Sequence, residues 1–117
     1  MNAERHLAKA KEIEGSLEQL LPDPDGRNVV AIVELTYGIL QHLIAIGCER
    51  NLKEHKNSHV GLAAFLRSHK QEPIADVFEK IDQYRAGRWY GGKGNGKIVA
   101  ECLNALNEVK KWSSKKD

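Results

Sequence analysis

The sequence is poor in cysteine, and this scarcity limits where the protein can work. Among 117 residues only Cys48 and Cys102 occur, and they form no Cys-x-x-Cys motif. Both lie in apolar segments with helical spacing, so we expect free thiols in the core of a protein from a reducing cytosol, rather than a disulfide. We expect no membrane partner either, because no segment approaches the roughly 18 consecutive apolar residues of a spanning helix.

The chain also lacks the other features that would assign it elsewhere. Its N-terminal stretch is charged throughout and has no apolar centre of a signal peptide, which again favours a cytoplasmic location. No internal repeat and no pattern of strands and turns is present. The net charge of +2 is small, so any affinity for nucleic acid must come from local clustering of cations.

Helical periodicity is what the sequence does contain. Apolar residues recur at helical spacing in five segments, which predicts an all-α up-down bundle of four main helices and one short helix. The expected helices span residues 3–21, 27–48, 58–68, 72–90 and 97–112. We expect Asp23 to cap the second helix and Asn95 the fifth. Residues 1–112 then form one domain, and residues 113–117 form a frayed, charged tail.

The second helix is apolar around nearly its whole circumference. A helix of this kind is either central to the bundle or packs against a second subunit as well. Its many β-branched residues are also typical of strands, but a segment of more than twenty residues is too long for one strand.

The most informative stretch is residues 84–97, YRAGRWYGGKGNGK. No acidic residue occurs between Asp82 and Glu101, whereas this stretch contains four cations and five glycines. Cations beside aromatic faces, with a backbone that permits close approach, suit a ligand that carries phosphates or bases. We expect no cofactor. The candidate binding residues are Arg85, Arg88, Trp89, Tyr90, Lys93 and Lys97.

Two of these cations continue an apolar helix face. The stripe that contains Ile81 and Tyr84 reaches Arg85 and Arg88 after one further turn. A buried charge without a partner is costly, so each arginine needs an acidic partner or a wet cleft. Arg85 has two candidate partners, Asp82 and Glu34. The alternative is an electropositive groove at the end of the bundle, and both arrangements can coexist.

The histidines do not form a metal or catalytic site by spacing. His55 and His59 are four residues apart, but they straddle a polar connection and have no further ligand nearby in sequence. We expect His42 to be a hydrogen-bonded histidine of the core or of an interface, and His6 and His69 to lie on the surface. No Ser/His/Asp or Cys/His arrangement is present.

The order of these features resembles the HEPN superfamily, the higher eukaryotic and prokaryotic nucleotide-binding proteins. The similarity covers roughly residues 29–109 and is greatest to the small stand-alone prokaryotic branch. It depends on an apolar second helix, a short helix with the sequence HVGLAAFL, a fourth helix that ends in RAGRWYG, and a last helix with the sequence AECLNALNEV.

The resemblance implies a homodimer that acts on RNA or binds nucleotides, as a component of a toxin–antitoxin pair or as partner of a nucleotidyltransferase. Active members carry an arginine and, after four to six intervening residues, a histidine. Arg85 matches the arginine, but Tyr90, Gly91 and Gly92 stand where the histidine is expected. The usual general acid–base group is therefore absent, and an unperturbed phenol is a poor base at neutral pH.

Three functions remain open from the sequence. The first is a non-catalytic domain that binds RNA or a nucleotide through residues 84–97. The second is a divergent, metal-independent ribonuclease with Arg85 and Tyr90 as catalytic candidates. The third is a homodimeric protein-interaction module that uses surplus apolar surface of the second helix and has no nucleic-acid ligand.

Overall fold

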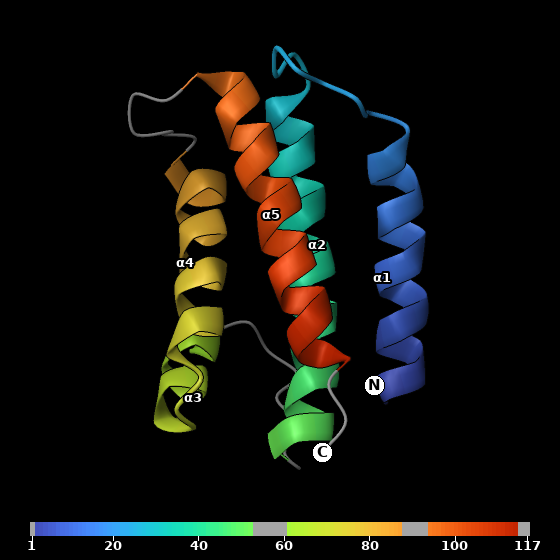
Figure 1. Cartoon of the computed structure of the whole chain (residues 1–117). Helices are drawn as coiled ribbons and strands as arrows, with labels where there is room; N and C mark the ends of the chain where they lie inside the picture. Colours follow the sequence, from blue (N-terminus) through green and yellow to red (C-terminus); the bar gives the residue numbers. More distant parts are fainter. Residues whose placement is uncertain (1, 53–60, 88–93, 115–117) are drawn as a thin grey trace.

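The structure is a computed structural model that describes residues 2–52, 61–87 and 94–114, and its described part is all-helical. The predicted all-α class is therefore confirmed (Figure 1). The helices are α1 (Ala3–Glu18), α2 (Val29–Gly47), a short π-helix η1 (Cys48–Leu52), α3 (Leu62–Ser68), α4 (Glu72–Gly87) and α5 (Asn95–Ser113).

Helix α2 is the centre of the bundle. It packs against α1, α4 and α5, and Figure 1 shows α1 and α4 on opposite sides of it with α5 across its face. This arrangement explains its apolar composition, because several of its largest side chains have no exposed surface at all. They include Ile32, Ile39, Leu40 and Ile44. Among the described residues, Val30 is the only large apolar side chain that is exposed.

The apolar length of α2 corrects the expectation that no segment approaches the length and apolar character of a membrane-spanning helix. Together with η1 it forms a continuous helix, Val29–Asn51, that is long and apolar enough to cross a membrane by length and composition alone. The central helix of a soluble bundle passes the same test, and most of this segment is buried against its neighbours. The packing of α2 inside the bundle thus accounts for its apolar character.

The short helix α3 lies against the first half of α4. The guanidinium group of Arg67, on α3, is 2.9 Å from the carboxylate of Asp76 and also pairs with Glu79, and both acidic residues lie on α4. These two acceptors raise the pKa of Arg67 above its usual range. All three side chains are well exposed, so the pairs orient the α3–α4 hairpin more than they stabilise it.

Hydrogen bonds from η1 connect the end of α2 to the end of α5. The amide of Asn51 donates to the carbonyl oxygen of Trp112 at 2.9 Å, and Arg50 donates to the carbonyl oxygen of Ser113 at 3.4 Å. The indole N–H of Trp112 donates to Gln71 at 3.0 Å. Gly47 lies directly against the indole ring, where a Cβ atom would overlap it. Trp112 is therefore a packing residue.

The helix ends differ from the predicted ones. Asp23 is not the N-cap of α2: its carboxylate accepts from the backbone N–H groups of Arg27 and Asn28 at 3.0 and 2.9 Å, and so closes the turn before the helix. Asn95 is the first residue of α5, which has Gly94 as its N-cap. Ser113 belongs to α5 and is buried, so this helix extends beyond the predicted end at residue 112.

Both cysteines are buried and free, as predicted. Burial raises the pKa of the Cys102 thiol to about 11. A thiol with so high a pKa is protonated at neutral pH and is a poor nucleophile. Cys102 is therefore a small apolar residue of the core.

His6 lies in the core, so the prediction of a surface position is wrong. Its side chain is 6% exposed, and its Nδ1 atom is 2.8 Å from Nδ1 of His42 on α2. His42 is a hydrogen-bonded histidine of the α1–α2 contact, as expected. Burial, and then the charge of Lys9, lower the pKa of His42 below its ordinary value of 6.5. The contact requires that one ring donates a proton and the other accepts it.

We predict that Gly47→Ala lowers the free energy of unfolding by about 1–3 kcal/mol, because the new methyl group overlaps the Trp112 indole. Gly15→Ala on α1 is the matched control, since nothing lies near a Cβ atom there. It should leave stability unchanged or raise it by up to about 1 kcal/mol through helix propensity. Urea denaturation measures both values, and equal effects would contradict the proposed packing.

We also predict that the protein loses stability as the pH falls below 6.5. In that range the unfolded chain takes up a proton at His42 that the folded chain resists, so the unfolded state is favoured. Urea denaturation between about pH 7.5 and 5 should show a shallower dependence in His42→Gln than in the wild type. An identical pH dependence in both proteins would refute this role for the pair.

Candidate phosphate-binding end of the bundle

The candidate segment begins and ends at one end of the bundle. Figure 1 shows the end of α4, the start of α5 and the connection between α1 and α2 at that end. Close backbone contacts hold the last two together: a Cβ atom at Gly96 would overlap the carbonyl of Pro24, and one at Gly26 would overlap Asn95. Gly26 also has a φ of +70°, which favours glycine. The start of α5 is therefore fixed on the rest of the bundle.

Arg85 is held by three side chains. Its Nε atom donates to Oε2 of Glu34 on α2 at 3.2 Å, and its Nη1 atom is 3.9 Å from the carboxylate of Asp82. Its Cζ atom lies 4.4 Å from the centre of the Tyr37 ring. The side chain is still 37% exposed. Both predicted acidic partners are thus present, and part of the guanidinium faces solvent.

Tyr37 is the residue beneath Arg85 that sequence patterns did not predict. Its ring is 4% exposed and stacks on Phe78 with the ring centres 5.4 Å apart. Burial raises the pKa of the Tyr37 phenol, the charge of Asp82 adds to this effect, and Arg85 opposes it. The neutral ring offers Arg85 a π face, and a guanidinium over such a face is attracted to it.

Tyr84, the first residue of the candidate segment, has a structural role. It is buried, and its hydroxyl donates to Oε2 of Glu101 on α5 at 2.5 Å. The other oxygen of Glu101 is 3.1 Å from Nζ of Lys80. Burial and the Glu101 carboxylate raise the pKa of Tyr84 well above its usual value, so it is a donor throughout the physiological range. This cluster fixes α4 against α5 below the candidate site.

The start of α5 has the electrostatics of an anion site. The first backbone N–H groups of a helix lack partners within the helix and carry a partial positive charge. In α5 no side chain caps these groups among the described residues, and Lys97 lies exposed in the first turn. A mainly apolar hollow of 440 Å³ lies beside Gly96, between the 21–24 segment and α5.

Of the predicted binding residues, the structure describes Arg85, in the last turn of α4, and Lys97, in the first turn of α5. The other candidates, Arg88, Trp89, Tyr90 and Lys93, lie outside the described residues, as do His55 and His59. Within the described ranges, no group of three or more His, Cys, Asp or Glu side chains is placed to hold a metal ion.

No protein-family model matches the chain, and neither a curated protein nor a solved structure is significantly similar to it. The HEPN resemblance therefore depends on the sequence pattern alone and stays a prediction.

We predict that Tyr84→Phe lowers the free energy of unfolding by about 1–2 kcal/mol, because it removes a buried hydrogen bond to a charged group. Glu34→Gln, at the exposed Arg85 pair, should change stability by less than about 1 kcal/mol. Urea denaturation separates the two. A larger loss in Glu34→Gln than in Tyr84→Phe would mean that Arg85, and not Tyr84, stabilises α4 in the bundle.

Proposed function

We propose that this protein is a non-catalytic, HEPN-like domain that binds single-stranded RNA or a nucleotide at the end of the bundle formed by residues 84–97. The observation that carries the proposal is the position of Arg85. It is a half-exposed guanidinium, oriented by Glu34 and by the Tyr37 ring, at the end of a helix that leads into a segment without acidic residues.

The two described cations and the start of α5 supply complementary contacts for a phosphate. A guanidinium that is already oriented loses less conformational entropy when it binds a phosphate. Backbone N–H groups at the start of a helix donate hydrogen bonds to a bound anion, and the exposed Lys97 adds a positive charge there. Arg88 and Lys93 would add phosphate contacts, and Trp89 and Tyr90 would stack on bases.

The missing histidine supports binding without cleavage. Among the described residues around Arg85, the side chains are carboxylates paired with it and a tyrosine whose pKa is raised. A phenol with a raised pKa is ionised to an even smaller extent than an ordinary one at neutral pH, so even less of the basic phenolate is present. A divergent ribonuclease that uses Arg85 and Tyr90 is the alternative that the same experiment tests.

The HEPN resemblance also leads us to propose a homodimer, a cytoplasmic location, and a nucleotidyltransferase or the other member of a toxin–antitoxin pair as protein partner. The apolar side chains of α2 are used inside one chain, where only Val30 is exposed among the large described ones. A dimer would therefore need another surface than the one that the composition of α2 suggested.

We expect the wild-type protein to retard labelled single-stranded RNA in a gel at low salt, with an affinity that falls steeply as salt rises, because phosphate contacts release counterions. Arg85→Ala/Arg88→Ala should weaken binding by about tenfold or more. The matched control, Arg5→Ala/Lys70→Ala, removes one exposed cation from the first turn of α1 and one from the turn between α3 and α4, and should bind as the wild type does.

Circular dichroism verifies that both double variants fold. If the wild type cleaves the RNA and Arg85→Ala/Arg88→Ala does not, the protein is a ribonuclease and not a non-catalytic binding domain. Retardation that is absent at low salt, or equally weak in both double variants, would overturn the proposal and favour the protein-interaction module.

A further inference from the structure

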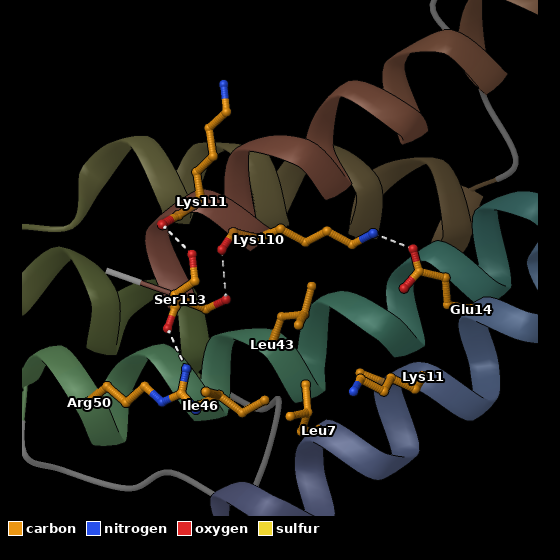
Figure 2. A pocket seen from close by; sticks show the side chains of 11 residues that line it. Leu7, Lys11, Glu14, Leu43, Ile46, Arg50, Lys110, Lys111 and Ser113 are labelled. Atoms are coloured by element: carbon orange, nitrogen blue, oxygen red, sulfur yellow. Dashed lines mark hydrogen bonds and ion pairs between the residues drawn. The ribbon is translucent and has the colours of Figure 1, made fainter. Parts of the chain in front are cut away.

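A second concave surface lies near the opposite end of the bundle, and the described residues of the 84–97 segment do not line it. It is a pocket of 360 Å³ between α1, α2 and the last turn of α5. Figure 2 shows its lining. Its volume falls in the range of small-molecule sites, which is about 300–1,000 Å³.

The floor of this pocket is aliphatic. It is formed by Leu7 and Ala10 of α1 and by Leu43 and Ile46 of α2. Among the described residues no aromatic side chain lines it, so these residues offer no platform for stacking a base. The part of a ligand that enters the pocket should therefore be an aliphatic chain.

The rim of the pocket is cationic. Lys11 and Arg50 face it from α1 and from η1, and Lys110 spans it to pair with Glu14, as Figure 2 shows. Arg50 donates to the carbonyl oxygen of Ser113 at 3.4 Å. Lys111 also belongs to the lining, but its side chain points away from the floor in Figure 2.

The charge of this rim is incompletely balanced. Among the described residues of the lining, Glu14 is the only acidic one, and it is paired with Lys110. Within the part of the chain that the structure describes, neither Lys11 nor Arg50 forms an ion pair with a carboxylate. Two cations thus flank an aliphatic floor, and an anionic group placed between them would be attracted by both.

We propose that this pocket binds a free, single-chain amphiphilic anion, with its aliphatic chain on the floor between α1 and α2 and its head group, such as a fatty-acid carboxylate, at Lys11 and Arg50. The charge of the rim selects the head group, and the aliphatic floor selects the chain. The proposal is independent of RNA binding, because it involves other residues at a distance from Arg85 and Lys97.

Isothermal titration calorimetry with decanoate, kept below the concentration at which it forms micelles, tests this site. We expect saturable binding of one decanoate per chain. Decanol, which has the same chain and no charge, should bind at least about tenfold more weakly, because it loses the charge-assisted contacts. Equal affinity for decanol and decanoate would overturn the role of the cationic rim.

Variants locate the binding. Lys11→Gln/Arg50→Gln should weaken decanoate binding by about tenfold, whereas Arg5→Gln/Lys70→Gln, which removes two cations that do not line the pocket, should change it by less than about twofold. All four side chains are exposed, so both proteins should fold. Equal effects of the two double variants, or no saturable binding by the wild type, would refute the proposal.

A last arm separates the free amphiphile from a lipid surface. Vesicles of phosphatidylglycerol present anionic head groups whose chains are held in a bilayer. Co-sedimentation of the protein with these vesicles, without any binding of decanoate, would identify the surface as a membrane contact and overturn the proposed site.

Discussion

Burial of α2 on several sides is the constraint on which the rest of the structure depends. A helix with apolar side chains around most of its circumference is stable in water only if other elements cover each face, and here α1, α4 and α5 do so. The consequence reaches both ends of the bundle. At one end α2 places Glu34 and Tyr37 beneath Arg85, and at the other it places Gly47 against Trp112.

The class of the fold and the existence of the five α-helices could be predicted because they follow from local periodicity, whereas η1 was expected to be a polar connection. Helix ends were harder. Asp23 followed by a proline has the pattern of an N-cap, yet its carboxylate bonds to N–H groups four and five residues later, because the chain makes a further turn before α2 begins. His6 was expected on the surface, and the contact that buries it was not predicted because its partner His42 lies on another helix.

The candidate site, like the fold, could be predicted only in part. A segment without acidic residues is visible in the sequence, and so are Glu34 and Asp82 as partners of Arg85. The Tyr37 ring beneath the guanidinium is not, because it depends on how α4 packs against α2. The pocket lined by Lys11 and Arg50 left no signal for the same reason, since residues from three helices form it. Contacts within one helix can be inferred from spacing, and a charge on an apolar face predicts that a partner exists, but most contacts between helices need the packing itself.

The central claim is that a phosphate-bearing strand binds where α4 ends and α5 begins. The most direct measurement is a titration of ¹⁵N-labelled protein with a short single-stranded oligoribonucleotide, followed by the amide resonances of the described residues. We expect progressive shifts at Arg85, Gly96 and Lys97 and none at Lys11 or Ser113. Unchanged resonances at the α4–α5 end, or shifts confined to the opposite end, would contradict the account.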